Sequence, residues 1–203
     1  MKHLRNLGDL LDRENVLSKP ALIDLSVKEK VRQFSHEDID AAAKAMARGL
    51  VKRGFKRGDH IAILAANSAE FLIAYLGTMR AGMISIPINH KFPSETIEFI
   101  LNDATCKLVF VDQDRLSQVP SGYPIVAFSG TDENNFDDWL DWGDFETIIP
   151  AKNEVAMFLY TSGSTGRPKG VPLTHEGHLW VIEMRLKQKP EPFHKMLVAA
   201  PLY

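Results

Sequence analysis

The chain has 203 residues, 45% of them hydrophobic and 25% charged, which excludes a disordered chain and indicates a folded globular protein. Its 24 basic and 26 acidic residues give a formal net charge of −2, so nothing in the charge balance points to nucleic acid. The single cysteine, Cys106, excludes an internal disulfide and favours a reducing, cytoplasmic location, and the apolar runs are too short for a membrane span.

Residues 1–119 alternate between helical and strand-like patterns, and we treat them as a first α/β portion. Ser35 is placed to cap a helix, with Asp38 three positions later in a variant of the capping box, and the helical spacing of apolar residues ends at Gly54. The apolar run at 60–65 predicts a short strand. Asn67-Ser68 then begins a second helix, which is apolar on most sides and is therefore predicted to be buried.

The same alternation continues after the second helix. Residues 83–87 predict a strand, Pro93 opens a third helix, and Leu108–Val111 predicts the next strand. This order predicts the fold class: an α/β layered structure with a mostly parallel sheet and helices on both faces.

The remaining residues divide into a connecting region at 120–150 and a structured stretch at 151–203. The connecting region is rich in turn-forming residues and holds one clear strand at 125–128. In the following stretch, Val155–Tyr160 predicts a strand, Thr174 caps a helix that runs to about Lys187, and Met196–Ala200 predicts a last strand.

The segment Thr161–Gly170 holds the residues that point to chemistry. Backbone N–H groups in a glycine-rich turn can form an anion-binding nest, and the glycines permit positive φ and close backbone approach. Lys169 adds a mobile positive charge suited to a terminal phosphate. The small or hydroxyl-bearing residues before it are Thr161, Ser162, Gly163, Ser164, Thr165 and Gly166.

The spacing in this segment differs from that of the common nucleotide-binding motifs. Arg167 and Pro168 separate Gly166 from the lysine, no Ser or Thr follows the lysine, and the G-x-G-x-x-G pattern is absent from it. Arg167 itself could reach a phosphate or lie in solvent. On the residues alone, the segment is either a polyphosphate-binding loop or an ordinary flexible Ser/Gly-rich turn. Residues 175–178, His-Glu-Gly-His, are one residue short of the zinc motif H-E-x-x-H, so solvent-facing or capping roles are predicted for these histidines.

The run Tyr-Thr-Ser-Gly-Ser-Thr-Gly-Arg-Pro-Lys-Gly at 160–170 resembles the phosphate loop of the adenylate-forming (AMP-binding) enzymes at every motif position. That family includes the acyl- and aryl-CoA synthetases, firefly luciferase and the adenylation domains of peptide synthetases. Weaker matches extend along nearly the whole chain, at Gly54–Asp59, Asn67–Glu70, Ala81–Asn89 and Pro201–Tyr203.

The resemblance implies a two-step reaction. A small carboxylic acid attacks the α-phosphorus of Mg-ATP, which gives an acyl-adenylate and pyrophosphate, and the thiol of coenzyme A then displaces AMP. It also implies that Lys169 has the catalytic role on the pyrophosphate side and that Thr161 helps to position Mg²⁺. The residues implied to hold the phosphates of ATP are Thr161, Ser162, Gly163, Ser164, Thr165, Gly166 and Lys169.

By the same resemblance, residues 1–203 correspond to the first part of the family's large N-terminal domain. The adenine and ribose motifs, the acyl pocket and the C-terminal domain with its catalytic lysine are then expected beyond residue 203, and the chain alone is not expected to complete adenylation. Two alternatives stay open: an acyl-AMP ligase that loads a carrier protein, and a nucleotide- or pyrophosphate-binding module without catalysis. Apolar surface on an incomplete sheet would favour a homo-oligomer.

Overall fold

The computed structural model describes residues 4–10, 20–129, 135–161, 167–188, 196–198 and 200–203. They form a six-stranded sheet in the order β6-β5-β3-β4-β7-β8, and every neighbouring pair is parallel except β7 and β8. The strands are β3 (His60–Leu64), β4 (Ile84–Pro87), β5 (Leu108–Val111), β6 (Ile125–Ala127), β7 (Val155–Thr161) and β8 (Lys169–Thr174).

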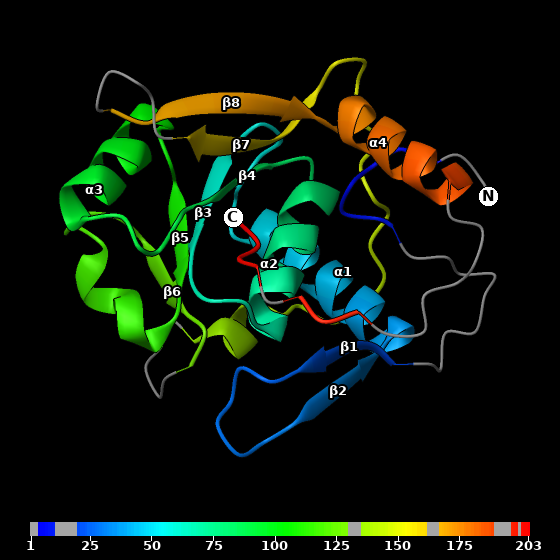
Figure 1. Ribbon diagram of the computed structural model, residues 1–203, viewed down its shortest axis with the longest axis horizontal. Helices are drawn as coiled ribbons and strands as arrows, with labels where there is room; N and C mark the ends of the chain where they lie inside the picture. The colour runs from blue at the N-terminus through cyan, green and yellow to red at the C-terminus, as the bar shows by residue number, and fades with distance from the viewer. Residues whose placement is uncertain (1–3, 11–19, 130–134, 162–166, 189–195, 199) are drawn as a thin grey trace.

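Helices cover both faces of the sheet (Figure 1). Alternate residues of β3 point to opposite faces, so Ile61 packs in one apolar cluster and Ala62 in the other. The first cluster includes Met46 and Phe71 from α1 and α2, and the second includes Ile100 from α3. The predicted fold class is therefore confirmed. The helices are α1 (His36–Lys52), α2 (Ala69–Arg80), α3 (Ser94–Asp103) and α4 (His175–Gln188).

The helices begin where the sequence places capping residues. The Ser35 hydroxyl accepts a hydrogen bond from the Asp38 backbone N–H at 3.0 Å, and the Asp38 carboxylate accepts one from the Ser35 N–H at 2.7 Å. Ser68 caps α2 by accepting from the Phe71 N–H at 3.1 Å, and Thr174 caps α4 in the same way. These side chains satisfy N–H groups that have no partner within the helix.

A two-stranded antiparallel ribbon, which the sequence patterns did not predict, precedes α1. It consists of β1 (Pro20–Asp24) and β2 (Arg32–Ser35). Arg32 ties it to the start of α2 through hydrogen bonds of 2.5 and 2.8 Å to Glu70, while the Asp24 carboxylate accepts from the Ala69 N–H at 3.0 Å. Tertiary charge pairing therefore holds this ribbon in place.

The stretch at 120–150 contributes to the core as well as connecting elements. Besides β6 it contains a short 3₁₀ helix, Phe136–Trp139, whose two end residues are buried, whereas Trp142 is 62% exposed. Phe136 packs edge-on against Phe110 of β5. A second 3₁₀ helix, Gln113–Gln118, follows β5. In the part of the chain that the structure describes, no helix is long and apolar enough to cross a membrane.

The predicted strand at Met196–Ala200 is wrong for the residues described there. Residues 196–198 lie outside any strand, and Met196 and Leu197 are 74% and 81% exposed. The backbone of this last segment is held by a side chain: the Asn67 amide donates to the Ala200 carbonyl at 2.8 Å and accepts from the Leu202 N–H at 2.9 Å. An apolar run becomes a strand only where a neighbouring strand satisfies its backbone groups.

Candidate functional site

The β7–β8 hairpin contains the first residue and the last two residues of the glycine-rich segment Thr161–Gly170. Thr161, the last residue of β7, pairs with Lys169, the first residue of β8, and both are exposed. Lys169 therefore begins a strand, which corrects its assignment to a loop. The predicted phosphate-binding residues Ser162, Gly163, Ser164, Thr165 and Gly166 lie outside the described residues.

The pairing places the Thr161 hydroxyl and the Lys169 ammonium on one face of the hairpin. Directly opposed residues of antiparallel strands project to the same face, with Cβ atoms about 5 Å apart. Because side chains alternate along a strand, Tyr160 and its partner Gly170 lie on the other face. The site thus has a face with an oxygen donor and a cation, and an opposite face that packs on the protein.

The packed face explains why position 170 is a glycine. A Cβ atom at Gly170 would lie 3.0 Å from Cζ and 3.1 Å from the hydroxyl of Tyr160. Gly170 is not among the described glycines with positive φ, so of the two reasons expected for a glycine, close approach is the one that applies.

Tyr160 is anchored to α3. Its hydroxyl donates to the Asp103 carboxylate at 2.7 Å, and burial together with this hydrogen bond raises the pKa of Tyr160 well above its usual value. Tyr160 therefore stays a protonated donor. The Arg167 guanidinium lies 5.4 Å from the ring centroid of Phe99, also on α3, so the structure gives this arginine a partner that sequence patterns did not identify.

His175, the first residue of α4, is buried at 3% exposure, so it has neither of the predicted roles: it does not face solvent, and Thr174 supplies the helix cap. Its Nδ1 accepts from the Leu7 N–H at 3.0 Å, and its own backbone N–H donates to the Glu154 carbonyl at 3.1 Å. Burial lowers the pKa of His175 to about 4, so the ring is neutral near pH 7. Its role is to hold residues 4–10 against the start of α4.

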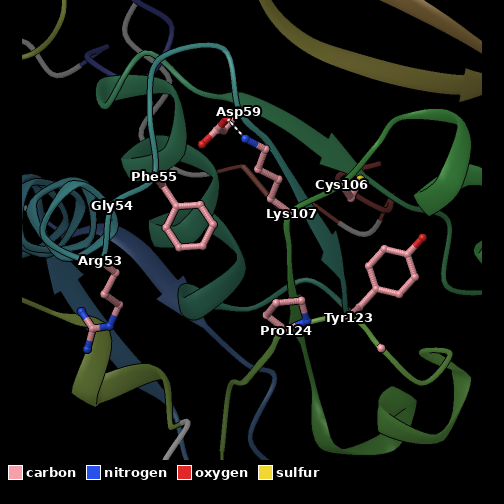
Figure 2. A pocket seen from close by; sticks show the side chains of 9 residues that line it. Arg53, Gly54, Phe55, Asp59, Cys106, Lys107, Tyr123 and Pro124 are labelled. Carbon is pink, nitrogen blue, oxygen red and sulfur yellow. Dashed lines mark hydrogen bonds and ion pairs between the residues drawn. The ribbon is translucent and has the colours of Figure 1, made fainter.

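A pocket of about 430 Å³ opens at the amino-terminal ends of β3, β5 and β6 (Figure 2). Lys107 in its wall forms a 2.6 Å ion pair with Asp59, and Arg53 stacks 4.3 Å from the ring centroid of Trp139. Burial raises the pKa of the Cys106 thiol to about 12, which keeps it protonated and unreactive. Because its charged groups serve the fold, we assign this pocket no chemistry.

Within the described ranges of the chain, no group of three or more His, Cys, Asp or Glu side chains could hold a metal ion. The near-match to a zinc motif at 175–178 is further weakened because the Nδ1 atom of His175 is already occupied by the Leu7 N–H.

Known proteins resemble both the sequence and the fold. The family described as AMP-binding enzyme matches residues 13–203. The 3-hydroxybenzoate–CoA/4-hydroxybenzoate–CoA ligase of Thauera aromatica is 30% identical, over 73% of this chain and 31% of the ligase. Tyrocidine synthase 1 of Brevibacillus parabrevis is 31% identical, over 86% of this chain and 18% of the synthase.

Among solved structures, ATP-bound MatB from Rhodopseudomonas palustris superposes with a TM-score of 0.68 at 28% identity, covering 78% of this chain and 33% of MatB. The chain thus spans about a third or less of the length of these relatives. Since the family match runs over almost the whole sequence, this chain belongs to the AMP-binding family of adenylate-forming enzymes.

Proposed function

We propose that the protein containing this chain uses ATP to convert a carboxylic acid into an acyl-adenylate and then transfers the acyl group to the thiol of coenzyme A. The observation that carries the proposal is the facing pair Thr161–Lys169, exposed at the ends of the segment that resembles the family's phosphate loop. The similarity of the chain to a CoA ligase and to an enzyme solved with ATP bound supports the same proposal.

Lys169 suits the pyrophosphate side of the first step. When the acid's carboxylate oxygen bonds to the α-phosphorus, the bond from that phosphorus to the bridging oxygen breaks and pyrophosphate leaves. Negative charge grows on this leaving group, and an ammonium group held nearby stabilises it more in the transition state than in bound ATP. In the second step, the CoA thiolate attacks the acyl carbon and AMP leaves.

Thr161 is the described residue that fits a magnesium ion. Its hydroxyl is a hard oxygen ligand at an exposed strand end, across from a cation that can hold phosphate. Mg²⁺ usually keeps several waters and binds through one or two protein oxygens together with substrate phosphates, so a single hydroxyl is compatible with it. When bound, the ion would neutralise phosphate charge.

ATP–pyrophosphate exchange, measured on the gene product that contains this chain, tests the first step. With saturating acid, Lys169→Ala should slow exchange about a hundredfold, the usual effect of removing one donor that stabilises developing charge. Lys152→Ala is the matched control, because Lys152 is also exposed but lies in the turn before the opposite end of β7. Equal exchange in the Lys169→Ala variant and the wild type would remove this lysine from the mechanism.

A second candidate is an acyl-AMP ligase that loads a carrier protein. Tyrocidine synthase 1 matches more of this chain than the hydroxybenzoate ligase does, at nearly equal identity. Supplying either coenzyme A or a phosphopantetheinylated carrier protein to the preformed acyl-adenylate separates the two candidates. Binding of ATP without any exchange would instead favour a non-catalytic nucleotide-binding module.

A further inference from the structure

Helix α3 contacts one residue near the end of β7 and one just before β8. The Tyr160 hydroxyl, in β7, donates to Asp103 at 2.7 Å, and the Arg167 guanidinium, two residues before β8, lies 5.4 Å from the Phe99 ring centroid. Phe99 and Asp103 are one helical turn apart and so share a face of α3. In Figure 1 the start of β8 lies close to α3.

These contacts are adjacent to the two residues assigned to the phosphates. Tyr160 directly precedes Thr161, and its cross-strand partner Gly170 directly follows Lys169. The Tyr160 ring lies against Gly170, where a Cβ atom would come within 3.0 Å of it. Fixing the Tyr160 ring therefore restrains both strands at the level of Thr161 and Lys169.

The position of Asp103 on its helix is unfavourable for helix stability alone. Asp103 is the last residue of α3, where the negative end of the helix dipole repels a carboxylate. It is exposed, so it adds little to the apolar core. The hydrogen bond that Asp103 accepts from Tyr160 therefore gives this carboxylate a favourable partner outside its own helix.

We propose that Asp103 is a positioning residue that acts through Tyr160 to hold Thr161 and Lys169 in place for the phosphates of ATP. This inference rests on the proposed function, since it gives the hydrogen bond a purpose only if the hairpin binds phosphate. The Phe99–Arg167 contact assists by restraining the chain just before β8.

The test is binding of inorganic pyrophosphate to the gene product that contains this chain, measured by titration calorimetry with Mg²⁺ present. Tyr160→Phe and Asp103→Ala should each raise the Kd about fivefold, which corresponds to about 1 kcal/mol, the usual net contribution of one hydrogen bond. The Kd of the double variant, Tyr160→Phe with Asp103→Ala, should not exceed the higher of the two single-variant Kd values, because both changes remove the same contact. Asp103→Asn should restore near-normal affinity, because its amide oxygen still accepts from Tyr160.

Tyr123→Phe is the matched control. The Tyr123 hydroxyl donates to Asn102 at 2.6 Å, so this variant loses a similar hydrogen bond to the neighbouring residue of the same helix, without contact to the hairpin. Its Kd should equal that of the wild type, and its melting temperature should change as much as that of Tyr160→Phe. Equal Kd values for Tyr160→Phe and Tyr123→Phe would overturn the positioning role.

A Lys169→Ala arm separates this inference from the proposed function. If Lys169→Ala abolishes pyrophosphate binding while Tyr160→Phe binds like the control, the positioning role fails and the proposed function stands. If the wild-type gene product does not bind pyrophosphate, or if its Lys169→Ala variant binds as well as the wild type, the proposed function fails and the positioning role fails with it.

Discussion

Lys169 pairs with Thr161 across the antiparallel strands β8 and β7, so the lysine is held by backbone hydrogen bonding at the first residue of a strand. Its position is therefore set by the sheet, and only the distal part of its side chain is free to adapt. The backbone of Lys169 is thus fixed while its ammonium group can move, which suits the role proposed for it beside a leaving pyrophosphate.

Replacing Lys169 with arginine should rescue only part of the exchange activity that alanine removes. The guanidinium keeps the charge, but its planar fork does not reproduce the compact ammonium on the same strand residue. We expect Lys169→Arg to be intermediate between wild type and Lys169→Ala when ATP–pyrophosphate exchange is followed at saturating acid. A rate equal to that of the wild type would mean that charge alone matters at this position.

His175 should make stability depend on pH. Its pKa is about 4 in the folded chain against an ordinary 6.5, mainly because it is buried, with Glu154 opposing and Arg57 adding to the shift. A group with a depressed folded pKa stabilises the fold above the unfolded value, and this contribution is lost as the pH falls from about 6.5 to about 4. The loss is at most about 1.4 kcal/mol per pH unit for one proton.

Urea unfolding at pH 7 and pH 5 measures this effect, and His175→Gln should reduce the difference between the two free energies of unfolding. Glutamine can still accept from the Leu7 N–H but does not titrate. His178→Gln, one helical turn later and less buried, serves as the control and should leave the pH dependence unchanged. An unaltered pH dependence in His175→Gln would contradict the assignment.

Gly49→Ala should destabilise the fold although alanine is the better helix former by about 1 kcal/mol. Gly49 lies inside α1, and a Cβ atom there would come within 1.7 Å of the Trp139 carbonyl oxygen. Because the clash is with backbone, we expect a loss of about 1–3 kcal/mol in the free energy of unfolding, as for other overpacked sites. Val51→Ala, on the exposed side of the same helix, should stay within about 0.5 kcal/mol of wild type.

Ser35→Ala should remove the cap of α1. The Ser35 hydroxyl and the Asp38 carboxylate each satisfy a backbone N–H of the other residue, so truncation should cost about 1 kcal/mol of unfolding free energy. Ser94→Ala is the comparison, because Ser94 is the first residue of α3 and follows Pro93, which occupies the cap position. Equal destabilisation by the two substitutions would argue against the capping box as the cause.

Local patterns in the sequence predicted much of the fold. The predicted caps Ser35 and Thr174 and the predicted start at Asn67-Ser68 marked three helix starts correctly. The apolar periodicities predicted the core strands and the helices between them. These features involve groups a few residues apart, whose geometry is set by helix and strand repeats. The family resemblance of residues 160–170 likewise depended on consecutive residues and is supported by the match over residues 13–203.

Other features required partners that are remote in the chain. β8 contains Pro172 and polar residues, so it resembles a loop until it pairs with β7, and the β1–β2 ribbon depends on Arg32 reaching Glu70. His175 resembled a surface residue, yet its partner is Leu7, 168 positions away.

The sequence by itself therefore determined the fold class, the helix starts and the family resemblance of residues 160–170, because each depends on the spacing of neighbouring residues. Only the tertiary structure decided that Lys169 begins a strand opposite Thr161 and that Tyr160 is bound by Asp103, 57 positions earlier. The physical reason is that an exposed polar side chain has many possible partners of similar hydrogen-bonding strength. Packing of α3 against the sheet selects one of them.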